Sequence, residues 1–210
     1  MRVSLILAAT PLGNPGDASA RLIAALTSAD VNAAEDSRRF HRLAADLGVT
    51  FTARVLSFFE GNEEDRTREL IAELKSGATV LVVSDAGMPT ISDPGFRLMR
   101  DAIAQGIEVS VIPGPSAVTM SVALSGLPTD RFSFEGFPPR TAGARLATFE
   151  KLRFEERTMV FFEAPHRLTE SLVDAVNVFG TERLGAICRE MTKRYEETIR
   201  GTLEQLATWS

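Results

Sequence analysis

A repeated pattern of short apolar runs, turns and helical stretches constrains the fold of this chain more than any other feature of its sequence. Over the first 126 residues, each apolar run is followed by a turn and then by a stretch of helical periodicity. Strands and helices that alternate in this way are typical of a parallel sheet with helices on both faces. We therefore predict an N-terminal α/β domain over residues 1–126. Its five parallel strands are expected at residues 3–9, 31–34, 55–59, 79–84 and 108–112.

A second and shorter α/β pattern follows a break in helical periodicity at Gly126-Leu-Pro-Thr-Asp130. We predict a smaller C-terminal domain of mixed α/β type over residues 127–210. The sequence ends inside the last expected helix, which Thr202 begins, so this domain is expected to be incomplete at its C-terminus. Its strands are expected at residues 132–134, 158–163, 184–189 and 197–200, and its other helices at residues 144–152 and 167–178.

The composition is that of an ordinary globular protein, with 44% hydrophobic and 24% charged residues. No apolar run approaches the roughly 18 to 20 residues that a membrane span needs, so no membrane partner is expected. Cys188 is the single cysteine and cannot form an internal disulfide, which favours a core role in a reducing compartment such as the cytoplasm. His41 and His166 do not match a metal-ligand spacing, and no metal is expected.

The net charge of −5 gives no support for a protein that binds nucleic acid through its overall charge. Such proteins are usually basic, because neutralising phosphates supplies much of their affinity. Residues 131–210 are nevertheless neutral, with twelve basic and twelve acidic side chains. Any basic surface must therefore be local, and the second half of the chain is the better place for it.

Three turns rich in Gly and Pro, at residues 11–17, 84–95 and 113–116, are expected at one edge of the first sheet. Ligands of open parallel sheets bind outside the carboxyl ends of the strands. In the second turn, Asp85 is followed by Ala86 and Gly87, which leave the main chain open to a ligand. One such loop alone is more simply a tight turn in which Asp85 caps a helix. Asp93 and Pro94 are expected at the N-cap and first position of the helix that follows.

The fingerprints of nucleotide sites are absent from the sequence. The turn at residues 10–17 lacks GxGxxG, and no segment resembles the phosphate loop GxxxxGK[ST]. No GxSxG elbow or Cys/His pairing suggests nucleophilic catalysis either. The predicted edge therefore suits a ligand without phosphates, held by backbone groups and one or two carboxylates.

Two clusters of mixed charge also lie at predicted strand ends. In Glu35-Asp-Ser-Arg-Arg39, either acid alone is most simply a residue at the positive end of a helix. The cluster Arg189-Glu-Met-Thr-Lys-Arg194 fits an exposed turn. It equally fits a site in which the Arg and Lys side chains bind phosphates and the carboxylate accepts a proton from a hydroxyl group.

Eight motifs occur in order over almost the whole chain: Ala9-Thr-Pro-Leu-Gly-Asn14, Ala34-Glu-Asp-Ser-Arg38, Val83-Ser-Asp-Ala-Gly-Met-Pro-Thr-Ile-Ser-Asp-Pro-Gly95, Pro113-Gly-Pro-Ser116, Leu127-Pro-Thr-Asp-Arg-Phe132, Glu135-Gly-Phe137, Phe162-Glu-Ala-Pro-His-Arg167 and Arg189-Glu-Met-Thr-Lys193. Together they closely resemble the ribosomal RNA small subunit methyltransferase I family, within the tetrapyrrole methylase superfamily. Because the match is long and ordered, it is more specific than any single motif.

The resemblance implies a homodimer of two-domain chains that binds S-adenosylmethionine in the cleft between the domains. It also implies methylation of the 2′-hydroxyl of a cytidine ribose in the 16S rRNA of the small ribosomal subunit. A sulfonium cofactor would account for the edge without phosphate motifs. The implied cofactor contacts are Leu12, Asp85, Met88, Ser116 and Ala117, with Phe162 and Met191 from the second domain.

The sequence departs from the superfamily's patterns in three places. Its tetrapyrrole enzymes carry Gly-Asp-Pro where this chain has Ser84-Asp85-Ala86, which favours the rRNA branch. Met88 and Thr90 stand where Thr and Leu are expected in that branch. Members of the branch also continue well beyond residue 210. Two alternatives to an rRNA methylase therefore stay open. One is a methylase that acts on tetrapyrrole carbon atoms, and the other is a non-catalytic module that binds S-adenosylmethionine.

The reaction implied by the resemblance needs a group that accepts the hydroxyl proton and cations that hold RNA phosphates. For the first role we expect the pair Glu190 and Lys193, with Glu35 or Asp36 as second candidates. For the second role the candidates are Arg38, Arg167, Arg189, Lys193 and Arg194.

Overall fold

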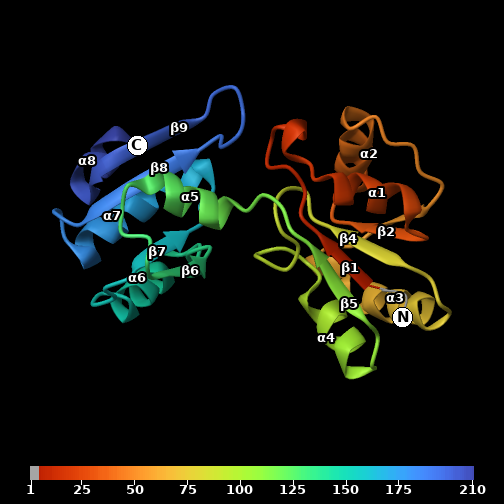
Figure 1. The fold of residues 1–210 in the computed structure, drawn as a ribbon. Helices are drawn as coiled ribbons and strands as arrows, with labels where there is room; N and C mark the ends of the chain where they lie inside the picture. Colours follow the sequence, from red (N-terminus) through yellow and green to blue (C-terminus); the bar gives the residue numbers. More distant parts are fainter. Residues whose placement is uncertain (1–4) are drawn as a thin grey trace. The chain divides into compact units, whose positions relative to one another are not determined.

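The computed structural model describes residues 5–210, which form two compact units, one ending at Ser116 and one beginning at Ala117 (Figure 1). Residues 3 and 4 of the first expected strand lie outside the described residues. No helix within the described part of the chain combines the length and apolarity that crossing a bilayer requires.

The first unit contains a five-stranded sheet in which all pairs are parallel, in the order β3-β2-β4-β1-β5. The neighbouring strands β4 and β1 are continuous apolar runs because both faces of the sheet are covered. The predicted parallel sheet is thereby confirmed. The strands are β1 (Leu5–Ala8), β2 (Val31–Ala34), β3 (Arg54–Ser57), β4 (Val80–Val83) and β5 (Val109–Ile112).

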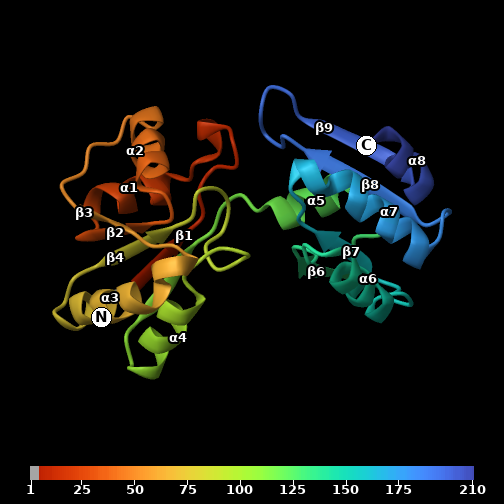
Figure 2. The same cartoon turned by 180° about the vertical axis from the view of Figure 1, so that it is seen from behind.

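Four helices cover the two faces of this sheet in pairs (Figure 2). On one face, α1 (Ala20–Ser28) and α2 (Ser37–Asp46) bury Leu22, Leu26 and Phe40 against the strands. On the other face, α3 (Glu63–Lys75) and α4 (Phe96–Ala104) bury residues such as Leu70 and Leu98. Two short 3-10 helices lie in the connections, η1 (Pro15–Asp17) and η2 (Glu60–Asn62).

The strand order places a topological switch point between β1 and β4. The chain leaves β1 through α1 on one face of the sheet, and it leaves the neighbouring strand β4 through α4 on the opposite face. Where two such connections diverge, a crevice forms outside the carboxyl ends of the strands, and ligands of doubly wound sheets bind there. The topology alone therefore marks the loops after β1 and β4.

The start of α4 corrects one prediction from the sequence. Asp93 and Pro94 were expected at its N-cap and first position, but the N-cap is Gly95 and the helix begins at Phe96. The prediction was wrong because another helix supplies the cap. The carboxylate of Glu63, the first residue of α3, accepts hydrogen bonds from the backbone N–H of Gly95 (3.0 Å) and of Arg97 (3.3 Å).

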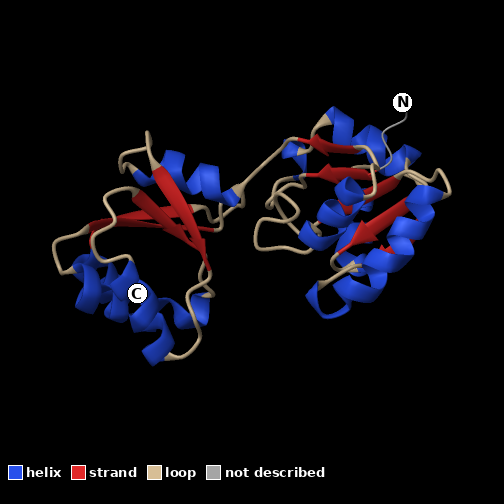
Figure 3. Ribbon diagram, turned by 90° about the horizontal axis from the view of Figure 1, so that it is seen from below, coloured by secondary structure: helices blue, strands red, loops and turns tan. Residues whose placement is uncertain are grey.

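The second unit has two pairs of strands, each covered by helices (Figure 3). The strands β6 (Phe132–Gly136) and β7 (Thr158–Phe161) pair in parallel, and β8 (Leu184–Arg189) and β9 (Glu197–Thr202) form an antiparallel hairpin. All four strands lie where the sequence predicts them. The helices are α5 (Ala117–Ser125), α6 (Ala142–Lys151), α7 (Leu168–Phe179) and α8 (Leu203–Trp209), with η3 (Pro165–Arg167) before α7.

The helix α5 belongs to the second unit, whereas the sequence places the domain boundary after residue 126. Its side chains Val118 and Val122 are buried with Val160 of β7. The thiol of Cys188 in β8 also lies 3.8 Å from the carbonyl oxygen of Ser121. The apolar pattern of α5 did not show this, because it fits packing on either unit.

Candidate functional site

A pair of backbone hydrogen bonds joins the loops after β1 and β4 at the switch point. Thr10 donates its N–H to the carbonyl of Gly87 (2.9 Å), and Gly87 donates its N–H to the carbonyl of Thr10 (3.1 Å). The buried hydroxyl of Thr10 donates to the carbonyl of Ser84 (3.2 Å), and the buried hydroxyl of Ser84 donates to that of Gly87 (3.3 Å). The two loops therefore form one structure.

Glycines allow the three predicted loops to approach one another closely at this edge. Gly87 has φ +85°, and a Cβ there would lie 3.3 Å from the Leu12 side chain and 3.9 Å from the Pro115 carbonyl. A Cβ on Gly114 would lie only 2.9 Å from the Cβ of Ala9, which is too close for a real contact. The loops after β1, β4 and β5 thus meet, as the sequence predicts, and their main chains stay open.

Three carboxylates gather beside these loops at the ends of β2 and β4. The carboxylate of Asp85 accepts from the N–H of Asp36 (3.1 Å) and lies 3.3 Å from the guanidinium of Arg39. The N–H of Asp85 donates to the carboxylate of Glu35 at 3.3 Å. Asp93 is the third member and interacts with the charges of Glu35 and Asp85.

Burial and mutual repulsion disfavour the charged forms of two of these groups. Burial raises the pKa of Glu35, and the charge of Asp85 raises it further, while the N–H of Asp85 and the charge of Arg39 lower it. Burial raises the pKa of Asp93 to about 6, and the nearby charges of Glu35 and Asp85 add to this, while the hydroxyl of Ser84 lowers it. A cation bound beside these groups would relieve both effects.

The segment from Met88 to Gly95 is held in an irregular conformation. Thr90 (φ 75°) and Ser92 (φ 62°) adopt left-handed backbone angles that are rare for residues with a side chain. The N–H of Thr90 donates to the carbonyl of Pro94 (3.3 Å), and that of Ile91 donates to the carbonyl of Met88 (3.4 Å). Strained backbone of this kind concentrates at ligand sites and persists only where surrounding contacts hold it.

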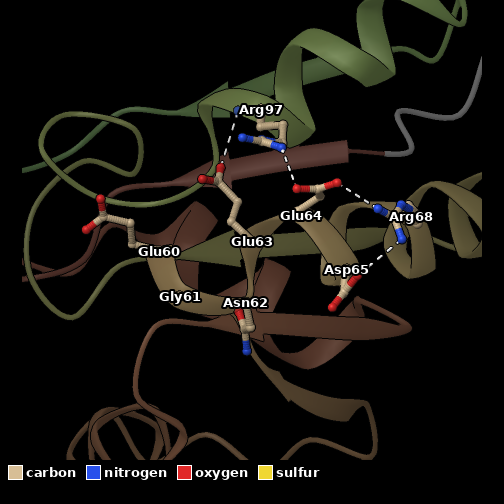
Figure 4. A pocket seen from close by; sticks show the side chains of 8 residues that line it. All are labelled: Glu60, Gly61, Asn62, Glu63, Glu64, Asp65, Arg68 and Arg97. Atoms are coloured by element: carbon tan, nitrogen blue, oxygen red, sulfur yellow. Dashed lines mark hydrogen bonds and ion pairs between the residues drawn. The ribbon is translucent and has the colours of Figure 1, made fainter.

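A pocket of about 590 Å³ opens where η2, α3 and α4 begin (Figure 4). Its walls are charged, and Arg97 reaches the carboxylate of Glu64 at 3.4 Å. The backbone N–H groups of Gly95 and Arg97 both donate to the carboxylate of Glu63, which ties the end of the Met88–Gly95 segment to α3. We assign the pocket no ligand. The lining residues are Glu60, Gly61, Asn62, Glu63, Glu64, Asp65, Arg68 and Arg97.

The expected cofactor contacts are divided between the two units, and all except Ala117 lie outside helices and strands. In the first unit, Leu12, Asp85 and Met88 lie on the joined loops, and Ser116 is the last residue of the unit. In the second unit, Ala117 is the first residue of α5, Phe162 follows β7, and Met191 lies in the turn between β8 and β9.

The expected proton acceptors differ in their exposure and in the groups to which they are already bonded. Glu190 and Lys193 pair at 3.1 Å on the exposed turn of the β8–β9 hairpin, where each side chain is about half exposed. Asp36 instead caps α2 and is paired with the guanidinium of Arg38, and these hydrogen bonds lower its pKa to about 2. A proton acceptor works best with a pKa near the working pH, so the lowered pKa makes Asp36 poorly suited to this role.

The expected RNA contacts also differ in what they already bind. Arg38 pairs with Asp36 at 2.8 Å. Arg189 pairs with Glu197 at 2.5 Å and lies 5.2 Å from the centre of the Trp209 ring. These side chains must exchange partners to bind a phosphate.

Among these candidates, Arg194 is exposed and has no ion pair within residues 5–210, whereas Arg167 is mostly buried and already bonded. Arg194 is exposed, lies 5.4 Å from the centre of the Tyr195 ring and makes no ion pair within residues 5–210. Arg167 is only 15% exposed and donates to the carbonyls of Pro138 (2.8 Å) and Pro139 (2.9 Å). Its guanidinium is thus used inside the second unit.

Sequence reasoning missed the contacts by which three residues hold the loops at this edge of the sheet. Thr10, Glu63 and Asp93 act through contacts with loops or helices distant in the sequence, which no local pattern shows. The one available signal was that Thr10 and Ser84 are polar residues at the ends of apolar runs. Within residues 5–210, no three side chains of the His, Cys, Asp and Glu types are grouped as a metal site would require.

The chain matches known proteins over nearly its whole length. The family model described as Tetrapyrrole (Corrin/Porphyrin) Methylases matches residues 4–207. The ribosomal RNA small subunit methyltransferase I of Mycobacterium tuberculosis (strain ATCC 25618 / H37Rv) is 53% identical over 206 residues, which is 98% of this chain and 72% of that protein. The protein of the same name from Halalkalibacterium halodurans is 42% identical over 207 residues, 99% of this chain and 71% of that protein.

The fold has a solved counterpart in uroporphyrin-III C-methyltransferase from Thermus thermophilus, in a crystal complex with S-adenosylhomocysteine. The TM-score is 0.65 with 15% sequence identity, over 98% of this chain and 86% of that chain. At this identity the likeness shows the fold alone. Because the family model and the two rRNA methyltransferases each span nearly the whole sequence, this chain belongs to the tetrapyrrole methylase family, among the ribosomal RNA small subunit methyltransferase I proteins.

Proposed function

We propose that this protein transfers a methyl group from S-adenosylmethionine to the 2′-hydroxyl of a cytidine ribose in 16S rRNA. The observation that carries the proposal is the 53% identity, over 98% of the chain, to a protein named ribosomal RNA small subunit methyltransferase I. The choice of cytidine and of the 2′-oxygen rests on the resemblance of the sequence motifs.

The residues at the switch point fit such a cofactor. S-adenosylmethionine carries a sulfonium and an amino group, and both favour the half-buried carboxylates Glu35, Asp85 and Asp93 over a phosphate cradle. Gly87 leaves the main chain open to a close approach. When bound, the cofactor supplies an electrophilic methyl group. We propose that Leu12, Asp85, Met88 and Ser116 hold it from the first unit and Ala117, Phe162 and Met191 from the second.

The remaining work of the chain is to hold the ribose hydroxyl in line and to accept its proton. Positioning supplies much of the rate enhancement in such transfers. We propose the pair Glu190 and Lys193 as the proton-accepting group, because it is exposed on a hairpin turn. Glu35 is the second candidate, since its raised pKa suits a base better than the lowered pKa of Asp36.

The proposed phosphate contacts are Arg38, Arg189, Lys193 and Arg194. Arg167, the remaining candidate from the sequence, is bonded inside the second unit and is not among them. Arg194 is the strongest of these, because it is exposed and has no carboxylate partner within residues 5–210. The acidic net charge of −5 makes such local cations necessary.

We further propose a homodimer that acts in the cytoplasm. The dimer is implied by the resemblance to the family, and the location follows from the substrate, because small ribosomal subunits are assembled there. Sedimentation equilibrium tests the dimer, and a mass of one chain at all accessible concentrations would contradict it.

Labelled methyl transfer tests the proposed activity. The protein should methylate small ribosomal subunits assembled with unmodified 16S rRNA, and mapping should locate the label on a cytidine ribose. Uroporphyrinogen III offered as acceptor should take up no label. Binding of S-adenosylhomocysteine without transfer to the subunits would indicate a non-catalytic module instead.

Single replacements test the proposed base. Glu190→Ala and Lys193→Ala should each lower the transfer rate by roughly 10²- to 10⁴-fold if the pair acts in proton transfer. Undiminished transfer by both variants would remove the pair from the chemistry and leave Glu35 as the candidate.

A further inference from the structure

A bulge near the end of β6 precedes Phe137, whose ring is partly exposed. The pairing with β7 shifts between Phe134 and Gly136, so that Glu135 has no partner residue, and Gly136 has φ +69°. The carbonyl of Gly136 accepts the N–H of Phe162 at 2.9 Å, which fixes the position of the bulge. Bulges beside functional sites re-aim the side chains that follow them. Here the following side chain is Phe137, which is 54% exposed.

A buried ion pair holds the loop that carries Phe137. Arg167 donates from one guanidinium nitrogen to the carbonyls of Pro138 and Pro139, and its other terminal nitrogen lies 3.4 Å from the carboxylate of Glu163. Glu163 is only 9% exposed and also accepts from the hydroxyl of Ser171. This arrangement joins the loops after β6 and β7.

The exposed ring of Phe137 has an aromatic support and basic neighbours. Its centre lies 5.6 Å from that of Phe162, and Phe162 lies 4.8 Å from Phe134, both in edge contacts. The loops after β6 and β7 also carry Arg140 and His166, which are exposed and make no ion pair within residues 5–210. We name Phe137, Arg140 and His166 the aromatic–basic patch.

We propose that Phe137 stacks on an unpaired base of the RNA substrate, with Arg140 and His166 contacting the adjoining phosphates. The inference rests on the proposed rRNA methylation. Sequence-specific proteins read RNA mainly in single-stranded segments, where bases stack on aromatic rings or guanidinium planes. A fixed loop that keeps an aromatic ring half exposed, and that carries an exposed arginine without an ion pair in residues 5–210, fits this use. A ring needed only for packing would be turned inward, as Phe134 is.

The matched control for Phe137 is Phe154. It is 89% exposed, belongs to the same unit and has an arginine, Arg153, near its ring at 6.0 Å. Phe154 follows α6 and precedes β7, so it lies toward the amino ends of the parallel strands, whereas Phe137 follows the carboxyl end of β6. Replacing either ring removes exposed apolar surface of the same kind.

The test measures methyl transfer to small ribosomal subunits assembled with unmodified 16S rRNA. Phe137→Ala should raise KM for the subunits roughly 5- to 100-fold, the range of base–aromatic stacking. Phe137→Trp should stay within a few-fold of the parent protein, and Phe137→Leu should behave like the alanine variant, since it keeps bulk without a ring. Phe154→Ala should leave KM unchanged. Calorimetric affinity for S-adenosylhomocysteine should change much less than KM in the Phe137 variants, because Phe137 would affect the cofactor only through Phe162, and it should be unchanged in Phe154→Ala.

Several results would overturn the inference. An unchanged KM for Phe137→Ala, or equal losses for Phe137→Ala and Phe154→Ala, would remove the stacking role. A parallel loss of S-adenosylhomocysteine affinity would assign Phe137 to the cofactor instead. If the parent protein transfers no methyl group to the subunits, the proposed function fails and the inference falls with it. Ultraviolet crosslinking of the folded parent protein to 16S rRNA should yield a nucleotide on the peptide that contains Phe137, and a crosslink confined to other peptides would contradict stacking.

Discussion

At the scale of single residues, Asp93 couples the stability of the first unit to pH. Its pKa of about 6 in the folded protein, raised by burial and by Glu35 and Asp85, exceeds the ordinary value of 3.8. Between about pH 4 and pH 6 the folded chain therefore keeps a proton that the unfolded chain has lost. Because the folded state binds more protons in this window, the free energy of unfolding falls as the pH rises.

Replacement of Asp93 by asparagine should remove this dependence. As the pH rises from 4 to 7, the parent protein should lose about 1–2 kcal/mol in free energy of unfolding that Asp93→Asn keeps. This value is smaller than the full pKa shift would give, because the side chain of Asp93 is only partly buried. Urea denaturation over this range measures the difference. Parallel pH profiles for the two proteins would contradict the raised pKa.

Also at the scale of single residues, the buried ion pair of Arg145 should stabilise the second unit. Its side chain is 2% exposed and bonds the carboxylate of Asp174 through two nitrogens, at 2.7 and 2.6 Å. Arg145→Met leaves that carboxylate buried without a partner, which should cost about 3–5 kcal/mol in free energy of unfolding. The control is Arg153→Met, whose half-exposed pair with Glu150 should contribute under about 1 kcal/mol. Similar losses in urea denaturation would show that burial of the Arg145 pair is unimportant.

At the scale of elements, the joined loops after β1 and β4 depend on Gly87. Gly87→Ala places a Cβ at φ +85° and close to Leu12, which should cost about 1–3 kcal/mol in stability. Because the loop must shift, the affinity for S-adenosylhomocysteine should fall at least about tenfold, the equivalent of 1.4 kcal/mol.

Gly77 provides the control for this prediction. It has φ +92° and lies in the turn before β4, at the opposite edge of the sheet, where an added Cβ would meet no atom within 4 Å. Gly77→Ala should therefore cost similar stability but leave the affinity unchanged. Calorimetry together with urea denaturation separates the two effects, and equal affinity losses would contradict a cofactor site at the switch point.

The elements themselves were largely predictable, and the errors have a common cause. Four of the five strands of the first unit, all except β2, are recognisable because each is followed within four residues by Gly or Pro. The start of α4 was missed because Asp93-Pro94 matches a capping pattern, while the carboxylate that caps the helix comes from Glu63 in α3. Local patterns cannot reveal which distant side chain satisfies a helix end.

The geometry of the candidate site was partly predictable, while the roles of its residues stay a prediction. That Glu35 and Asp85 lie close together follows from their positions just after two strands, because strand ends meet at one edge of a parallel sheet. The exposure of Phe137 was not foreseen, because it depends on the bulge at Gly136. The internal use of Arg167 was missed as well, since the carbonyls of Pro138 and Pro139 that it binds lie in another loop.

At the scale of the whole molecule, a net charge of −5 means that RNA affinity must come from a few local cations. If Arg194 contacts a phosphate, Arg194→Ala should reduce the slope of log affinity against log salt concentration by roughly 0.7–0.9. The control is Lys75→Ala, which makes the same charge change in the last turn of α3. Filter binding of 16S rRNA over a series of KCl concentrations measures both slopes, and equal reductions would indicate a nonspecific effect of net charge.

The position of Trp209 gives the protein a built-in optical probe. It is the only tryptophan of the chain, it is 40% exposed, and the guanidinium of Arg189 lies against its ring at the base of the hairpin that carries Lys193 and Arg194. A polyanion that draws Arg189 away would remove a positive charge from the indole and alter its fluorescence emission. Engagement of the hairpin by a ligand is thus visible in unlabelled protein, on the timescale of a stopped-flow instrument.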